Sequence, residues 1–149
     1  ERGGVETFVF DLRGNTGGYP LSGFQRLIRY AGRTNRELFG NIYVLVDGFT
    51  YSNGTVFADL WRRQVEDVVV MGAPTAGTLN FFAAAMRRTL PSSGIGFYVS
   101  TVAHFYDETT DLQLPLIPDI IVLRTLEDYI NHHDAAIELI RQRAAQRRN

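Results

Sequence analysis

The chain contains no lysine, and all 15 of its basic residues are arginine. A serine hydroxyl becomes a nucleophile only when a base activates it, so the absence of lysine excludes a lysine base within this chain. Cysteine is also absent, which excludes disulfides, thiol catalysis and thiolate metal sites but leaves the compartment open. No apolar run approaches the roughly 20 residues of a membrane-spanning helix, so no membrane span is expected. Residues 1–6 lack the basic and then apolar order of a signal peptide.

Size and charge set further limits. The 149 residues suit a single domain, residues 1–149, that buries roughly 70% of its unfolded surface. The net charge of -1 gives no reason to expect a polyanionic partner, so nucleic acid is not expected. The acidic stretch with Asp107, Glu108 and Asp111 lacks the spaced oxygen ligands and the glycine of a calcium loop, and no metal is predicted. The loop Gly72–Thr78 lacks the Gly-Lys-Ser/Thr of a phosphate loop, and no cofactor is expected.

Hydrophobic patterning predicts an α/β fold in which strands and helices alternate over the first half of the chain. The predicted strands are 7–12, 41–46, 68–71 and 119–122, with a hairpin formed by 81–90 and 95–103. The predicted helices follow Pro20 as far as Gly32, occupy about 53–63, and begin after Thr125 and Asp134. Residues 107–113 are expected to form an exposed loop. Because the chain opens almost directly on a buried strand, elements that precede it are expected to be missing at the N-terminus.

A glycine-rich turn follows the first predicted strand, at the edge where open α/β sheets place their sites. Gly14, Gly17 and Gly18 can adopt conformations closed to other residues, so they can aim backbone amides at one point and let a substrate approach closely. An oxyanion would fit such a turn. Glycines after a strand can also form no more than a tight turn, and this alternative remains open.

A second turn, Asp47–Gly54, follows the next predicted strand. Ser52 precedes the helix amides of Asn53 and Gly54, whose partial positive charge favours an alkoxide or a developing oxyanion. Ser52 or Thr50 can equally be a helix N-cap, which is the commoner role of such residues. Two amide-rich turns that each follow a buried strand together favour the catalytic interpretation.

The order of motifs along the chain resembles the S41 family of serine peptidases, which includes the C-terminal processing peptidases and the tricorn-core relatives. The resemblance runs from Val5 to about Leu139, and it rests on these motifs: Phe10–Asn15, Gly17-Gly18, Val44–Val46, Thr50–Ser52, Gly72–Gly77 and Ile117–Asp119. It implies a ClpP/crotonase-like fold built from repeated strand-strand-helix units. It also implies amide-bond hydrolysis by an attacking serine.

The resemblance assigns roles to individual residues. It makes Ser52 the nucleophile, and it makes the backbone amides of Gly17, Gly18 and Asn53 the oxyanion donors. Members that use a serine and lysine pair carry the lysine where this chain has Thr78. The tricorn-like branch instead takes a histidine from sequence upstream of the first motif, together with an acidic residue shortly before the Pro-Asp motif.

The base is therefore expected to come from outside this chain segment, although two residues could support the site. Asp111 lies near the acidic position of the tricorn-like branch without matching it cleanly. His104 ends a predicted strand, where alternation could point it into the cleft, although a histidine with a structural hydrogen bond is the commoner case. His132 and His133 are interpreted as surface residues beside the cap at Asp134.

Three functions follow as hypotheses. The first is a serine peptidase that acts on protein or peptide substrates through Ser52. The second is a peptide-binding or scaffold module that retains the fold without the chemistry, which Thr78 and the absence of lysine favour. The third is an acyl-CoA enzyme of the crotonase type, against which the Thr50–Ser52 turn argues. A homo-oligomer, or association with the missing N-terminal part, is expected, and the resemblance alone implies an extracytoplasmic location.

Overall fold

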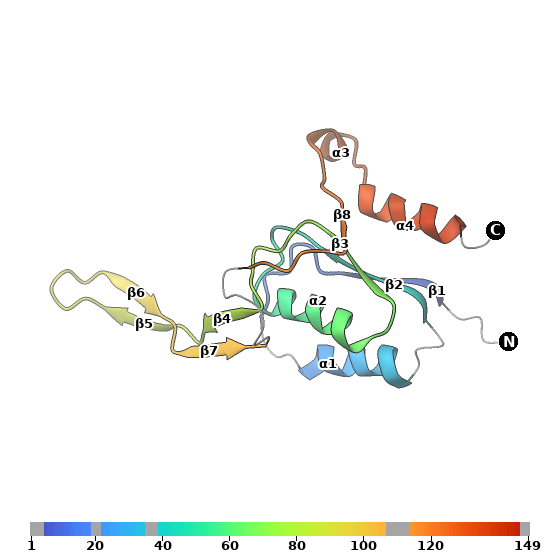
Figure 1. Ribbon diagram of the computed structural model, residues 1–149. Helices are drawn as coiled ribbons and strands as arrows, with labels where there is room; N and C mark the ends of the chain where they lie inside the picture. Colours follow the sequence, from blue (N-terminus) through green and yellow to red (C-terminus); the bar gives the residue numbers. More distant parts are fainter. Residues whose placement is uncertain (1–4, 19–21, 35–38, 107–113, 147–149) are drawn as a thin grey trace.

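Four parallel strands form the central sheet of the protein, which is known from a computed structural model that describes residues 5–18, 22–34, 39–106 and 114–146 (Figure 1). The strands lie in the order β1-β2-β3-β8 and pair in register throughout. Their bounds are β1 Val5–Asp11, β2 Phe39–Val46, β3 Val68–Gly72 and β8 Ile120–Ile121. The mixed α/β fold with strand-helix alternation is as predicted from the sequence.

Helices cover both faces of the sheet. Helices α1 (Ser22–Arg29) and α2 (Asn53–Gln64) lie on one face, and α4 (Ala135–Gln146) lies on the other (Figure 1). Along β2, alternate residues enter the two cores: Val44 packs on the α1 and α2 side, and Leu45 packs on the α4 side. A strand buried on both faces carries a continuous apolar run, which explains the sequence from Ile42 to Val46.

The core beneath α1 and α2 is aromatic. The buried Trp61 of α2 lies against Phe10 of β1, with ring centroids 5.4 Å apart, and Phe24 of α1 stacks on Phe57 of α2 at 4.2 Å. The π-helical turn Tyr30–Thr34 extends α1 past Gly32, where the sequence predicted the helix to end. A Cβ at Gly32 would lie 2.4 Å from Val65 Cγ2, so glycine is needed there for close packing rather than for helix termination.

The second half of the chain adds a projecting β arm and two helices at the other end. The arm consists of two antiparallel pairs, and its strands are β4 Asn80–Ala83, β5 Met86–Thr89, β6 Gly96–Val99 and β7 Val102–Phe105. The predicted hairpin is thus correct, with an interruption at Ala84, whose φ is 52°, and an extension to Phe105. The arm leaves the body of the molecule at the base of β4 and β7 (Figure 1).

Both predicted helix starts near the C-terminus are present. Helix α3 (Leu126–Ile130) has a reciprocal capping box between Thr125 and Asp128, and the Asp134 carboxylate accepts the Ile137 amide hydrogen at the start of α4, at 3.1 Å. Residues 107–113 lie outside the described part of the chain, so the predicted loop there stays a prediction. In the described part, no helix is long and apolar enough to cross a membrane.

Candidate active site

The turns after β1 and β2 lie against each other. The Tyr51 amide donates to the Asn15 carbonyl at 2.9 Å, and the Asn53 side-chain amide donates to the Gly18 carbonyl. Gly17 lies directly beside Ser52, because a Cβ built on Gly17 would be 2.8 Å from Ser52 Cβ. The two turns that the sequence singled out therefore share one small volume at the carboxyl end of the sheet.

Ser52 has a strained backbone, and its side chain does not cap helix α2. Its φ of 53° and ψ of -125° lie in a region that favours glycine, and its side chain makes no hydrogen bond to the amides of α2. Ser52 therefore occupies the N-cap position of α2 without the side-chain hydrogen bond of a capping residue. Ser52 thus lies on a strained turn between β2 and α2, and nucleophile elbows likewise place a serine on a strained strand-to-helix turn.

A third loop, which contains Gly77, also approaches Ser52 closely. A Cβ on Gly77 would lie 2.8 Å from the Ser52 nitrogen, and the amides of Ala76 and Gly77 both donate to the Thr50 carbonyl, at 3.0 and 3.3 Å. The glycine in this loop is required by close backbone approach rather than by a positive φ. Ser52 is therefore held between two glycine-bearing loops.

The Ser52 side chain borders a cavity of about 200 Å³. The residues that line it are Tyr51, Ser52, Ala76, Gly77, Thr78 and Phe81. The lining carries no acidic or basic side chain, and it combines hydroxyl groups with the apolar ring of Phe81 next to Ser52.

Two of the three amides that the sequence nominated as oxyanion donors have no acceptor in the described part of the chain. Within the described residues, neither the Gly18 amide nor the Asn53 amide donates a hydrogen bond. The Gly17 amide, by contrast, donates to the Asn15 Oδ1 atom at 2.8 Å. Within the part of the chain that the structure describes, the amides of Gly18 and Asn53 thus lack an acceptor, whereas the Gly17 amide is engaged and Gly17 lies directly against Ser52.

Thr50 holds the elbow to the first turn. Its side chain is completely buried, and its hydroxyl donates to the Leu12 carbonyl at 3.0 Å and accepts the Asp47 amide hydrogen at 3.0 Å. The Asp47 carboxylate in turn accepts the Gly14 amide hydrogen at 3.0 Å. Because both turns are fixed by buried or short contacts, the geometry around Ser52 is preorganised.

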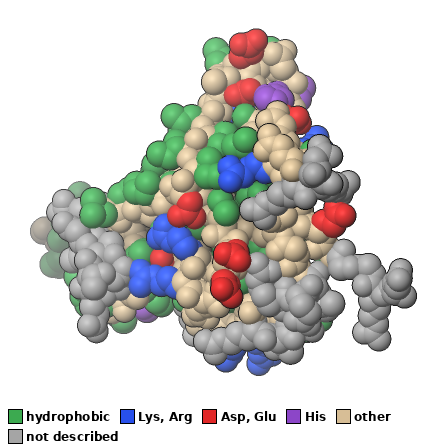
Figure 2. All heavy atoms as spheres, turned by 45° about the vertical axis from the view of Figure 1, so that its right-hand side comes forward, with side chains coloured by type: hydrophobic (Ala, Val, Ile, Leu, Met, Phe, Trp, Pro, Cys, Tyr) green, Lys and Arg blue, Asp and Glu red, His purple; other side chains and the backbone are tan. Residues whose placement is uncertain are grey.

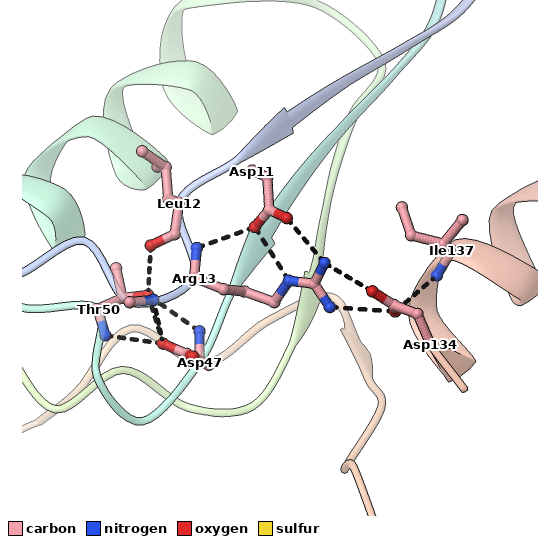
Figure 3. A network of polar contacts seen from close by, with 8 residues as sticks. Asp11, Leu12, Arg13, Asp47, Thr50, Asp134 and Ile137 are labelled. Carbon is pink, nitrogen blue, oxygen red and sulfur yellow. Dashed lines mark hydrogen bonds and ion pairs between the residues drawn. The ribbon is translucent and has the colours of Figure 1, made fainter. Parts of the chain in front are cut away.

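Arg13 links the first turn to the opposite face of the sheet (Figure 3). Its guanidinium binds Asp11 at 2.7 Å and Asp134 at 2.8 Å, so it joins the loop after β1 to the start of α4. The hydrogen bonds that Arg13 donates to Asp11 and Asp134 raise the pKa of Arg13, and the hydrogen bond from Arg13 lowers the pKa of Asp134. Asp11 and Arg13 therefore pair with each other and hold the loop after β1.

His104 does not border the Ser52 cavity. It lies opposite Phe81 in the β4-β7 pair, stacks on the Phe81 ring at 5.5 Å, and stacks on Tyr106 at 6.0 Å. Phe81 does line the cavity, so His104 is one ring removed from it. Partial burial raises the pKa of Tyr106.

The other nominated residues are further from a role in proton transfer. The Thr78 hydroxyl lines the cavity but donates to the Asn80 carbonyl at 2.6 Å. Asp111 lies outside the described residues. His133 binds Asp128 at 2.7 Å on exposed α3, in keeping with a surface role. Within the described part of the chain, no group hydrogen-bonds the Ser52 hydroxyl, and no cluster of side chains could hold a metal ion.

A larger cavity of about 490 Å³ lies between α3, α4 and the ends of β2 and β3, away from Ser52. Phe49, Arg124 and Tyr129 are among its lining residues, and the Arg124 guanidinium lies 3.8 Å from the Tyr129 ring centroid. Exposed hydrophobic side chains accompany acidic and histidine side chains at the α3 end of the molecule (Figure 2). Because this cavity lacks the strained serine and the free amides, the smaller cavity is the better candidate for chemistry.

Solved structures share this arrangement of strands and helices. A candidate peptidase from Parabacteroides merdae ATCC 43184 superposes with a TM-score of 0.66 at 22% identity, and the tricorn protease superposes with 0.69 at 15% identity. The chain has a peptidase-like fold. The matches cover 93% and 99% of this chain, but the chain spans only 52% of the first protein and 16% of the second.

A third similar structure is a lipoprotein from Streptococcus agalactiae, with a TM-score of 0.51 at 15% identity over 85% of this chain and 54% of that one. No protein-family model matches the sequence, and no curated protein matches it. The likeness therefore concerns the fold, and the chemistry has to be argued from the site.

Two residues of the site were missed in the sequence. Asn15 receives the Gly17 amide on its side chain and the Tyr51 amide on its carbonyl, which joins the two turns. Phe81 belongs to the arm and also walls the cavity. An asparagine between two glycines is a turn signal that could have drawn attention to Asn15, whereas nothing in the sequence indicates that Phe81 reaches the cavity.

Proposed function

We propose that this chain is the nucleophile-bearing part of a serine peptidase of the S41 type, with a ClpP/crotonase-like fold. Ser52 is the nucleophile, and the amides of Gly18 and Asn53 are the oxyanion donors. The observation that carries the proposal is the strained Ser52, held beside the Gly17–Gly18 turn with two free amides next to it. Strain at a non-glycine residue persists only where its surroundings impose it, and it gathers at functional sites.

The chemistry follows from the geometry. The Ser52 hydroxyl attacks the carbonyl carbon of a peptide bond, and a base takes its proton. The negative charge that forms on the carbonyl oxygen is stabilised by the amides of Gly18 and Asn53. Each such hydrogen-bond donor lowers the free energy of the transition state by about 3 to 4 kcal/mol. Collapse of the intermediate releases the amine and leaves an acyl-enzyme on Ser52, which water then hydrolyses.

The general base comes from outside the residues described here. The chain has no lysine, Thr78 donates its hydroxyl to a backbone carbonyl, and His104 is separated from the cavity by Phe81. Without a base the oxyanion donors alone support weak catalysis, so the isolated chain is expected to turn over peptides slowly.

The direct test uses the native full-length protein. Ser52→Ala is expected to abolish peptide hydrolysis and labelling by a serine-directed fluorophosphonate, with an unchanged unfolding midpoint. Asn53→Ala retains the backbone amide and serves as a control for the loss of side-chain contacts at the same turn. Undiminished turnover in Ser52→Ala would reject the assignment.

A second test supplies the missing base. Thr78 borders the same cavity as Ser52, so Thr78→Lys is expected to increase the rate of fluorophosphonate labelling of the isolated chain. Thr78→Arg is the matched control, because arginine adds a similar charge and length but is not deprotonated in proteins. Equal labelling rates for the two variants would contradict the placement of Ser52 as a nucleophile within reach of residue 78.

A peptide-binding module without catalysis is the second candidate. It is favoured by one observation, that no described residue hydrogen-bonds the Ser52 hydroxyl. This candidate predicts that peptides bind in the cavity and remain intact even in the full-length protein. An acyl adduct on Ser52, detected by mass spectrometry after a rapid acid quench, would rule it out.

A further inference from the structure

The β arm is built as an isolated ribbon. Its four strands pair only with one another, and every residue of β5 and β6 is exposed. In the described part of the chain no further strand pairs with either outer edge. A lone two-stranded ribbon is marginally stable in water, and its free edges can accept another extended chain.

The β arm, residues 80–106, carries positive side chains and no negative ones. Residues 80–106 contain no aspartate or glutamate, whereas Arg87 and Arg88 are consecutive residues of β5 and so point to opposite faces of the ribbon. Neither arginine has an ion-pair partner among the described residues. Arg87 lies opposite Tyr98 and Arg88 lies opposite Phe97, so each face of the ribbon combines a cation with an aromatic ring.

The arm is continuous with the candidate active site. The loop that contains Gly77 leads directly into β4, whose Phe81 both walls the Ser52 cavity and stacks on His104. Aromatic side chains thus lie both at the base of the arm, at Phe81 and Tyr106, and on its outer pair of strands, at Phe97 and Tyr98. Tyr98 is 72% exposed, so this apolar surface is accessible.

We propose that the arm binds the extended polypeptide of the substrate outside the cleaved segment, and that Arg87 and Arg88 select carboxylates in it. This inference rests on the proposed function, and it adds a substrate preference to it. Arg88 lies seven residues beyond Phe81, and the interruption at Ala84 makes the roughly 23 Å of a fully extended seven-residue chain an upper limit for their separation. The preferred substrate is thus an unfolded segment with apolar residues at the cavity and an acidic pair about seven residues away.

Charge and backbone chemistry favour this occupant over two others. A second copy of the arm would bring the arginines of two chains together, which costs energy through like-charge repulsion. A bilayer would leave the open edges of the ribbon unpaired in hydrocarbon, which spanning or inserted backbone does not tolerate. An added peptide strand satisfies the edges and brings carboxylates to the arginines.

The test measures binding of fluorescent peptides to the chain that carries Ser52→Ala, so that cleavage cannot interfere. One peptide has 18 residues, an apolar centre and Asp-Glu pairs seven residues from the centre on both sides; the second replaces these pairs by Asn-Gln, and the third by Lys-Arg. Arg87→Glu with Arg88→Glu is expected to weaken binding of the acidic peptide about five- to tenfold, the range for exposed ion pairs that are lost and reversed. The amide peptide should be unaffected, and the basic peptide should bind the double variant better than the original chain.

The matched control is Arg141→Glu with Arg143→Glu on α4, which makes the same charge change far from the arm and should leave all affinities unchanged. Equal loss in this control, or no preference for the acidic peptide, would overturn the inference. Dimerisation that depends on Arg87 and Arg88 without peptide binding would also overturn it, as would binding to anionic vesicles in place of peptide.

The inference and the proposed function fail in distinguishable ways. Cleavage that needs Ser52 but is insensitive to the arm variants, for long acidic peptides, would support the peptidase and remove the arm preference. Charge-dependent binding along the arm with no acyl adduct on Ser52 in the full-length protein would support the arm and remove the peptidase.

Discussion

Gly17→Ala is the perturbation that most sharply probes how the two turns meet. Gly17 has a φ of 100°, and a Cβ there would lie 2.8 Å from Ser52 Cβ and 3.0 Å from the Asn53 nitrogen. The unfavourable backbone costs about 1 to 2 kcal/mol for an L-residue, and an overpacked contact against backbone costs about 1 to 3 kcal/mol more. We expect the free energy of unfolding to fall by about 3 kcal/mol, as measured by urea denaturation.

The control for this prediction is Gly14→Ala in the same turn. Gly14 also has a positive φ, of 70°, but a Cβ there meets nothing within 4 Å. The free energy of unfolding of Gly14→Ala should fall only by the cost of the unfavourable backbone conformation, about 1 kcal/mol. Because the contact to Ser52 is what distinguishes the variants, Gly17→Ala should also lose fluorophosphonate labelling in the full-length protein, whereas Gly14→Ala should retain most of it. Equal destabilisation by both variants would refute the close approach of Gly17 to the elbow.

Three further predictions concern the same frame. Ser52→Gly should be more stable than Ser52→Ala by about 1 kcal/mol in urea denaturation, because glycine relieves the positive φ; the reverse order would argue against strain at the elbow. Thr50→Val should lose about 1 to 3 kcal/mol because it removes the donor to the buried Leu12 carbonyl and the acceptor of the part-buried Asp47 amide, and Thr50→Ser should retain most of that stability, so similar losses would show that the hydroxyl is unimportant. Arg13 lowers the pKa of Asp134, so this carboxylate stabilises the fold above its unfolded pKa of about 3.9 and loses that contribution as pH falls through its folded pKa. Stability measured from pH 6 to pH 2.5 should therefore fall more steeply than in Asp134→Asn, and parallel curves would contradict the role of the pair.

Much of the fold could be predicted because its signals are local. The apolar run of β2, the helix that begins at Asn53 and the capping box at Thr125 each depend on neighbouring residues, and the structure has all of them. The end of α1 was misplaced because Gly32 serves packing against Val65, which is a tertiary contact. The single-domain prediction for residues 1–149 and the extracytoplasmic location stay predictions.

The sequence indicated which turns form the candidate site, but it did not indicate the contacts that join them. Amide-rich turns after two predicted strands pointed to Gly17 and Ser52, because such turns can be recognised from a few neighbouring residues. The engagement of the Gly17 amide by Asn15, and the approach of Phe81 from the arm, depend on how distant segments pack. Whether Ser52 caps its helix could not be decided either, because the answer lies in its φ and ψ.

The most direct measurement of the central claim is a crystal structure of the full-length protein after reaction with a fluorophosphonate. The account predicts phosphorus bonded to Ser52 Oγ, with the phosphonyl oxygen accepting hydrogen bonds from the amides of Gly18 and Asn53 at about 2.7 to 3.1 Å. An adduct on a different residue, or a phosphonyl oxygen that points away from both amides, would contradict it.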